Sequence, residues 1–392
     1  MLLSQREFYM QNINKQSVRN HAYLESIVTQ LTDKLAFQLD TFDGLFPAAC
    51  SINGIYPLTS NTDWTTGFWS GATALSSSLS QQPLFHSHLQ RQVESFTQRL
   101  QQKHDLDTHD LGFLFTLSCV NTWRMTGNQQ ARQSALQAAD TLMTRYHPKA
   151  GIIQAWGDLQ DPEQQGRMII DCMMNLPLLY WASEQTGSDD YAHCAYNHAQ
   201  QAQRYLFRSD HSTFHTFYMD VVTGQPRGGK THQGFADNSC WARGQAWAIY
   251  GCALSYSYTG DKQFLNSATV AARFFLTHLP PDGICYWDLS LTAAETQKDT
   301  SAAIIAVCGL LELANHLSVV DPERHDFIQQ ALSMLDTLLE TYFDSEHNYG
   351  GYLTHSVYNM NKKRGVGEYS TWGDYFLFEA ISRLFSPEAK YW

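Results

Sequence analysis

The sequence predicts an all-α protein with an (α/α)6-barrel fold, and three observations carry this prediction. Helical periodicity runs through nearly the whole chain, two kinds of helix alternate, and related turns recur between them. A chain of 392 residues is long enough for one large barrel. No Pro- or Ser-rich linker divides it, so we expect residues 1–392 to form a single domain.

The first kind of helix is amphipathic. In 128–146 the apolar side chains fall on one stripe, and 327–343 repeats the pattern. Helices of this kind cover a core with one face, so we assign them to the outside of the barrel.

The second kind of helix is apolar nearly all round, as in 241–258 and 301–314. A helix without a polar face is buried on every side. We therefore predict a closed inner ring, because the inner helices of an open solenoid would leave one surface exposed.

The turns between helices carry related stop signals: Thr126-Gly127-Asn128, Thr186-Gly187-Ser188 and Thr259-Gly260-Asp261. Glycine supplies the left-handed residue that ends one helix, and the following Asn, Ser or Asp can cap the next helix.

Six buried helices are predicted to begin near residues 64, 111, 173, 239, 300 and 373. Successive aspartates mark five of these starts at separations of 47, 61, 66 and 62 residues, about one helical hairpin each: Asp63, Asp110, Asp171, Asp237 and Asp299. In a barrel these starts meet at one end and define a pocket.

Composition excludes several classes of partner. The net charge of −12 argues against nucleic acid and anionic membranes, which reward basic patches. The N-terminal stretch "MLLSQREFYMQNINKQ" is too short in apolar residues for a signal peptide, and no apolar run is long enough to span a membrane. The eight cysteines are scattered singly, as in reduced cytoplasmic proteins, so we expect a cytoplasmic location.

Acids at helix starts are ordinary caps, but two of them have unusual neighbours. Asp171 follows apolar residues in "RMIIDCMMNLP", and Pro177 is tolerated if the helix begins near Met173 or Met174. Asp110 follows His109 and precedes the apolar run "LGFLF". Burial raises a carboxyl pKa, and if both acids line one pocket each raises the proton affinity of the other, which favours acid–base catalysis.

Other polar residues are weighed in the same way. The cluster "HDLDTHD" (104–110) fits neither a zinc helix nor a calcium loop, so no metal site is predicted. Arg243 and Trp247 are four residues apart, so they share a helix face and could bind a carboxylate and a sugar ring. The alternative is an Arg243 paired with Asp237 and a Trp247 in the core.

These residues lie in motifs that resemble the unsaturated glucuronyl hydrolases, glycoside hydrolase family 88. The similar segments are spread through most of the chain in family order: "NTDWTTGFWSG" (61–71), "HDLGF" (109–113), "IIDCMMNLPLLYWA" (170–183), "HQGFADNSCWARGQAWAIYG" (232–251) and "STWGDYFLFEA" (370–380). The resemblance implies an (α/α)6 barrel, no cofactor, and oligosaccharide substrates that end in a 4,5-unsaturated uronic acid.

The resemblance also implies roles for particular residues. Asp171 is the expected general acid/base and Asp110 its essential partner. His109 is a further candidate beside Asp110. The other implied substrate-binding residues are Trp64, His215, Gln233, Arg243 and Trp247, with His211 as a competitor of His215. Protonation of C4 and attack of water at C5 would replace direct attack at the anomeric carbon.

Three alternatives stay open: an unsaturated rhamnogalacturonyl hydrolase, a sugar 2-epimerase, and a non-catalytic sugar-binding toroid. The chain also departs from relatives that prefer sulfated substrates, because it reads "YNMNKKRGVGEYS" where they can carry serines and a lysine. Lys362, Lys363 and Arg364 could bind sulfate or lie in a solvated loop. Neither sulfation preference, linkage nor oligomeric state follows from the sequence.

Overall fold

The protein is described from a computed structural model, which covers residues 20–292, 297–346 and 348–392. The N-terminal stretch 1–16, for which the sequence predicts no signal peptide, lies outside the described residues. Within them, no helix is both long and apolar enough to cross a membrane.

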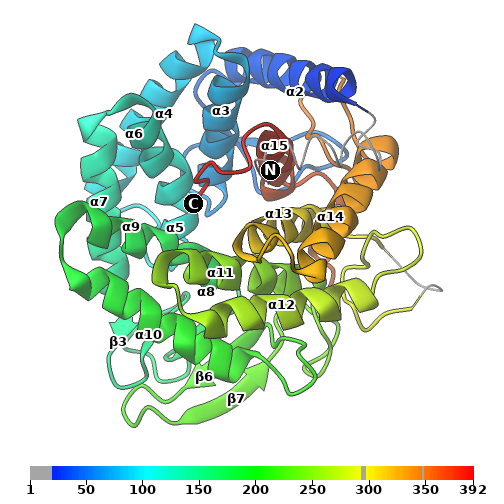
Figure 1. Ribbon diagram of the computed structural model, residues 1–392. Helices are drawn as coiled ribbons and strands as arrows, with labels where there is room; N and C mark the ends of the chain where they lie inside the picture. Colours follow the sequence, from blue (N-terminus) through cyan, green and yellow to red (C-terminus); the bar gives the residue numbers. More distant parts are fainter. Residues whose placement is uncertain (1–19, 293–296, 347) are drawn as a thin grey trace.

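The fold is an (α/α)6 barrel in which outer helices surround an inner ring (Figure 1). Along the chain the outer helices are α2 (His21–Thr41), α4 (Pro83–Gln101), α7 (Gln129–Met143), α10 (Asp189–Leu206), α12 (Lys262–Thr277) and α14 (Pro322–Thr341). They bury one face each, as the amphipathic pattern predicts; α7, for example, buries Ala131, Ala135, Ala138 and Leu142.

Six inner elements alternate with them: α3 (Thr66–Ser80), α5 (Leu111–Phe115) with its continuation, α8 (Cys172–Asn175) with α9 (Pro177–Thr186), α11 (Ala242–Thr259), α13 (Thr300–His316) and α15 (Thr371–Phe385). Each packs against the next, and α15 packs against α3. The ring is therefore closed, which confirms the toroid over an open solenoid.

Two inner elements are less regular than predicted. After α5 the chain forms a π-helical turn over Thr116–Val120 and then α6 (Asn121–Thr126). Pro177 does not lie within one helix that starts near Met173. Instead α8 ends at Asn175, and Pro177 is the first residue of α9, where its missing N–H costs nothing.

Short antiparallel strands connect the helices. β1 (Phe46–Pro47) pairs with β2 (Leu58–Thr59), β3 (Tyr146–His147) with β4 (Ile152–Ile153), and β8 (Ser356–Asn359) with β9 (Arg364–Glu368). The larger sheet has the order β5 (Arg167–Ile169), β6 (Thr216–Met219), β7 (Pro226–Lys230). Because β5 leads directly to Asp171, this sheet, which periodicity did not predict, forms a wall beside the start of α8.

The core contains large aromatic side chains along the barrel axis. Trp247 on α11 contacts Phe113 on α5 and Phe376 on α15, with ring centroids 5.4 and 5.5 Å apart. Trp392 stacks on Phe376. These aromatic side chains fill the space enclosed by the inner helices. The open space therefore lies at the ends of the barrel.

Candidate active site

A cavity of about 280 Å³ lies where the inner helices begin. Its lining includes every side chain that the sequence singled out as catalytic or substrate-binding: Trp64, His109, Asp110, Asp171, His215, Gln233, Arg243 and Trp247. These residues come from the segments that lead into or begin four of the six inner elements, so the barrel closure brings together positions that are up to 183 residues apart in the chain. The structure thus places the predicted residues in one site.

Asp110 and Asp171 stand at the N-cap positions of α5 and α8, yet neither side chain caps its helix. Asp110 Oδ2 instead accepts a hydrogen bond from Thr108 Oγ1 at 2.8 Å. Asp299, at the start of α13, is an ordinary cap, because its Oδ1 accepts from the backbone N–H groups of Ser301 and Ala302. The two cavity carboxyls are therefore available for chemistry in a way that Asp299 is not.

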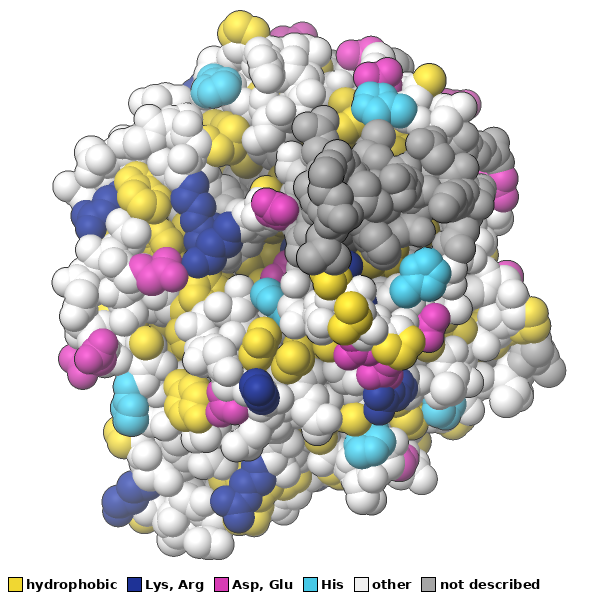
Figure 2. Space-filling model, viewed as in Figure 1, with side chains coloured by type: hydrophobic (Ala, Val, Ile, Leu, Met, Phe, Trp, Pro, Cys, Tyr) yellow, Lys and Arg dark blue, Asp and Glu magenta, His cyan; other side chains and the backbone are white. Residues whose placement is uncertain are grey.

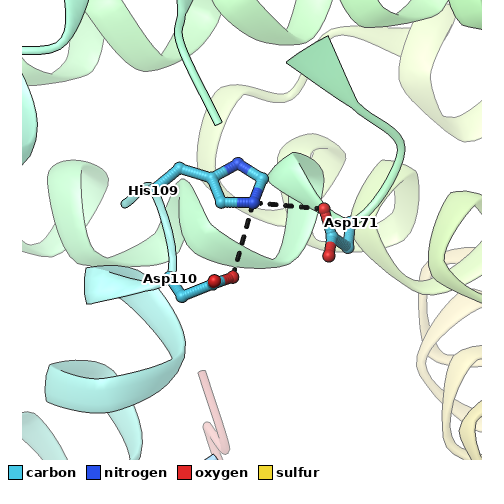
Figure 3. Close-up of side chains that lie close together, drawn as sticks. All are labelled: His109, Asp110 and Asp171. Carbon is cyan, nitrogen blue, oxygen red and sulfur yellow. Dashed lines mark ion pairs between the residues drawn. The ribbon is translucent and has the colours of Figure 1, made fainter. Parts of the chain in front are cut away.

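His109 lies between these two carboxyls (Figure 3). Its Nε2 is 3.4 Å from Asp110 Oδ1 and 3.3 Å from Asp171 Oδ1. The imidazole is only 2% exposed, and burial lowers its pKa to about 3, with the positive charge of Arg145 adding to the effect. The ring is consequently neutral near pH 7 and can present a single N–H to the acid pair.

Both acids hold their protons more tightly than free carboxyls do. Burial raises the pKa of Asp110 to about 6, against the hydrogen bond from Thr108, which lowers it. Burial also raises the pKa of Asp171 well above its ordinary value, and the negative charge of Asp110 raises it further. Because the charge of Asp110 adds to the effect of burial, Asp171 is the acid of this pair that holds its proton more tightly.

The same three residues are a group that could hold a metal ion, since one donor atom from each lies within 4.8 Å of the others. Carboxylates bind metals in their ionised form, and the raised pKa of Asp171 opposes ionisation. The donor set therefore fits a pair of acids that share a proton better than it fits a cation, and activity after chelator treatment distinguishes the two.

His215 lies in the cavity wall, whereas His211 does not line it. Its Nδ1 accepts hydrogen bonds from the backbone N–H groups of His232 at 2.9 Å and Gln233 at 3.0 Å. The proton of the neutral ring must then be on Nε2, which is a donor. Burial lowers the pKa of His215 well below its usual value, so the imidazole stays neutral.

Arg243 is held from several sides. Its Nη1 donates to Val357 O at 2.7 Å and its Nη2 to Tyr358 O at 2.8 Å. Its guanidinium lies 4.6 Å from the ring centre of Trp241 and 4.5 Å from that of Trp372. Its carboxylate neighbour is Asp299, with Nη1 4.0 Å from Oδ2.

The suggested alternative partner of Arg243, Asp237, is therefore wrong. Asp237 also marks no helix start, because α11 begins at Ala242 and the Asp237 carboxylate accepts from the backbone N–H of Thr231 within a loop. The regular spacing of the aspartates predicts a helix start next to Asp237. In the structure the loop continues past Asp237, and the helix begins at Ala242.

The two predicted tryptophans differ in their access to the cavity. Trp64 is partly exposed; its indole N–H donates to Tyr358 Oη at 3.0 Å and its ring stacks on Trp372. Trp247 is 1% exposed and packs among core rings. Trp64 is thus the ring that offers a face to a sugar, whereas Trp247 forms the floor of the cavity.

Five further residues line the cavity that were not singled out as site residues: Trp156, Ile169, His232, Trp241 and Tyr358. His232 adjoins the chosen Gln233, and its presence in the same motif was a usable signal. Trp156 and Tyr358 lie on irregular and strand segments where helical periodicity gives no information. Their position depends on contacts between distant parts of the chain.

The sequence profile described as Glycosyl Hydrolase Family 88 matches residues 48–340. The chain is 40% identical over 367 residues to an unsaturated chondroitin disaccharide hydrolase of Streptococcus pneumoniae, which covers 93% of this chain and 92% of that protein. The sequence similarity therefore extends over nearly the whole of both chains.

Solved structures agree with the sequence comparison. The crystal structure of the unsaturated glucuronyl hydrolase from Bacillus sp. GL1 has a TM-score of 0.90 at 41% identity, covering 92% of this chain and 96% of that one. An unsaturated glucuronyl hydrolase from Streptococcus agalactiae, an aspartate-to-asparagine mutant complexed with dGlcA-GalNAc6S, has a TM-score of 0.85 at 36% identity, covering 95% and 93%.

Proposed function

The chain belongs to Glycosyl Hydrolase Family 88, and we propose that its cavity removes the terminal 4,5-unsaturated uronate from oligosaccharides made by polysaccharide lyases. It is an enzyme of the unsaturated glucuronyl hydrolase type, and glycosaminoglycan-derived oligosaccharides are its substrate class. The observation that carries the assignment of residues is the pair Asp110 and Asp171, which stand at helix starts without capping them and share one neutral imidazole.

The substrate is reactive at its C4=C5 bond, which is an enol ether conjugated to a carboxylate. A proton added at C4 leaves an oxocarbenium-like centre at C5, and water adds there. The resulting hemiketal opens, and the hemiacetal left at C1 collapses to release the remaining sugar as an alcohol. Because water adds at C5, the carboxyl separation that distinguishes retaining from inverting glycosidases does not apply.

Asp171 is the proposed proton donor, because it is the more strongly proton-binding of the two acids. Its conjugate base then accepts a proton from the attacking water. Asp110, ionised at neutral pH, stabilises the positive charge that develops at C5 and keeps the pair at one proton. Proton transfer by a positioned side chain contributes about 10²- to 10⁴-fold to a rate.

The remaining residues hold the sugar. The His215 Nε2–H is a neutral donor for an oxygen of the uronate, because its Nδ1 is occupied by two backbone N–H groups. Gln233 accepts from Arg243 at 3.4 Å through Oε1, which leaves its amide N–H groups to donate. Trp64 supplies the ring face for stacking. Arg243 contributes positive charge to a cavity that must receive an anion.

The test is a loss of ultraviolet absorbance when an unsaturated disaccharide is added, because hydration removes the conjugated double bond. Sulfated and unsulfated chondroitin, hyaluronan and heparin disaccharides should be compared with an unsaturated rhamnogalacturonan disaccharide. Turnover of the last alone would overturn the glucuronyl assignment. Binding without loss of absorbance would indicate a sugar-binding protein, and epimerisation without hydration would indicate an epimerase.

Three narrower points accompany this function. We retain a cytoplasmic location, supported by eight cysteines that are all free and buried. We also retain a single domain for residues 1–392. Third, Lys362, Lys363 and Arg364 follow β8 or begin β9 beside the cavity wall, where the Arg364 guanidinium lies 4.3 Å from the ring centre of Tyr358. Comparing sulfated with unsulfated disaccharides tests whether these cations favour sulfated substrates.

A further inference from the structure

The outer face of the β5–β6–β7 sheet continues the wall of the cavity. Side chains on a strand alternate between two faces, so Arg167 and Ile169 on β5 point to the same side. Ile169 lines the cavity. Met168, between them, is fully buried on the other side. Asp171, Ile169 and Arg167 therefore follow one another, in that order, when β5 is traced back from the acid. Ile169 is the part of the cavity wall that lies between the other two.

Arg167 is fixed on this face by aromatic rings. Its guanidinium lies 4.8 Å from the ring centre of Trp156, a cavity residue, and 5.5 Å from that of Tyr218 on β6. Its Nε donates to Tyr218 Oη at 3.1 Å. Tyr218 is directly opposite Arg167 in the sheet register. Such stacking orients the planar guanidinium before any ligand arrives, which reduces the entropy lost on binding.

The terminal nitrogens of Arg167 have capacity to spare. In the described part of the chain, Nε makes its hydrogen bond to Tyr218 and no carboxylate lies within ion-pair distance of the guanidinium. The residue as a whole is only partly buried. An arginine held in this way and unpaired with an acid suits a bidentate contact with a carboxylate or sulfate.

The sheet also leaves room beside this group. Gly228 on β7 is directly opposite Tyr218, so Arg167, Tyr218 and Gly228 form a row across one face. A Cβ at Gly228 would meet nothing within 4 Å. On the opposite face a Cβ at Gly229 would meet the Phe214 ring at 2.4 Å. The face of the sheet that carries Arg167 thus has free space beside Gly228, whereas the opposite face is filled at Gly229 by the Phe214 ring.

We propose that Arg167, held by Trp156 and Tyr218, binds an anionic group on the leaving-group portion of the oligosaccharide, outside the cavity that receives the unsaturated uronate. The proposal rests on the function proposed above and adds a subsite to it. The anion is a sulfate on the second sugar or the carboxylate of a third sugar, and both present oxygens that a guanidinium fork binds.

The experiment uses the full-length protein with three substrates: an unsulfated unsaturated disaccharide, its sulfated counterpart, and an unsulfated unsaturated tetrasaccharide. KM and kcat are measured for the parent and for Arg167→Gln. For the substrate that carries the recognised anion we expect KM to rise about tenfold with kcat unchanged, as for the loss of one charge-assisted hydrogen bond. The unsulfated disaccharide should be unaffected, and the responding substrate identifies the anion.

The matched control is Arg204→Gln. Arg204 lies 5.2 Å from the ring centre of Tyr205, which stacks on Phe217. Phe217 and Tyr218 point to opposite faces of β6. Arg204→Gln therefore removes one arginine charge, as Arg167→Gln does, but on the face of the sheet away from Arg167. KM values should match the parent for all three substrates. If KM rises equally for all three substrates in Arg167→Gln, or changes for none of them, the proposed subsite is wrong.

Two further outcomes distinguish a failure of the Arg167 subsite from a failure of the proposed function or of folding. If the parent turns over none of the three substrates, the proposed function fails, whatever Arg167 does. If Arg167→Gln does not fold, Arg167→Lys and the salt dependence of KM in the parent protein decide the matter. We expect a steeper rise of KM with ionic strength for the substrate with the additional anion, and equal slopes for all three substrates overturn the proposal.

Discussion

Nε2 of His109 lies 3.3 Å from Oδ1 of Asp171, within a group whose three donor atoms are no more than 4.8 Å apart. The imidazole is neutral because burial lowers its pKa to about 3. It therefore contacts the proton donor without adding a positive charge that would favour ionisation of Asp171. Burial, followed by the negative charge of Asp110, raises the pKa of Asp171, although the helix dipole at this position favours the ionised form.

Asp171→Asn and Asp110→Asn should each lower kcat by about 10² or more, because the amide keeps the shape of the side chain but does not exchange protons. Melting temperatures should not fall, since neither carboxyl caps its helix. The comparison is Asp261→Ala, which removes a true cap of α12 and should cost about 1 kcal/mol of stability with kcat unchanged. Near-native turnover in either Asn variant would exclude that aspartate from the chemistry.

How much the sequence predicts depends on whether the signal is local. The glycines of the three recurrent turns adopt left-handed φ values of 70°, 74° and 68° for Gly127, Gly187 and Gly260. The residues that follow them cap α7, α10 and α12 with their side chains. These features depend on neighbours a few residues away, and the prediction of them is confirmed.

Features that depend on distant contacts were not predicted. The break before Pro177, the π-helical turn after Phe115 and the β5–β6–β7 sheet have no signature in a search for helical period. Trp156 could be counted among the aromatic residues but not placed beside the acids, since its position follows from a bridge to Thr108 across the fold. The predicted site was incomplete for that reason.

The raised carboxyl pKa values predict a stability effect. A group whose folded-state pKa lies above its unfolded value contributes stability that is present at low pH and lost as pH rises through the folded pKa. For Asp110 this window runs from an ordinary value of 3.8 to about 6. At pH 7 Asp110→Asn should therefore be more stable than the parent, by roughly 1–3 kcal/mol at about 1.4 kcal/mol per pKa unit.

The measurement is urea denaturation of parent and Asp110→Asn at pH 4 and pH 7. The difference in unfolding free energy should be small at pH 4 and grow toward pH 7. A difference that is constant with pH would mean that the carboxyl pKa is not raised in the folded protein.

Arg243→Ala should be strongly destabilising as well as inactivating. The substitution removes donors to the Val357 and Tyr358 carbonyls and leaves Asp299 buried beside the empty position. Breaking one side of a buried pair costs about 3–5 kcal/mol. Arg273→Ala, which breaks the exposed pair with Glu323, should cost at most about 1 kcal/mol. Equal melting temperatures for Arg243→Ala and the parent, with KM alone raised, would assign Arg243 to substrate binding only.

Removal of metal ions should leave activity unchanged. Dialysis against a chelator followed by the absorbance assay tests this directly, because His109, Asp110 and Asp171 offer three donor atoms close together. A chelator-dependent loss of kcat that added zinc or calcium restores would replace the shared-proton account with a metal site at the same residues.

The last prediction concerns pH and follows from the two acids acting in opposite protonation states. Asp171 must be protonated to attack C4, so activity should fall as pH rises through its raised pKa. Asp110 must be ionised, so activity should also fall as pH decreases below about 6. The kcat profile should be a bell whose two limbs belong to the pair, since the titrations of adjacent acids are linked.

Histidines are the competing explanation, but burial lowers the pKa of His109 to about 3 and that of His215 well below its usual value. Profiles of His109→Asn and His215→Asn should therefore keep both limbs at reduced rates. If the high-pH limb disappears in one of these variants while turnover remains, the titrating acid is that imidazole and not Asp171.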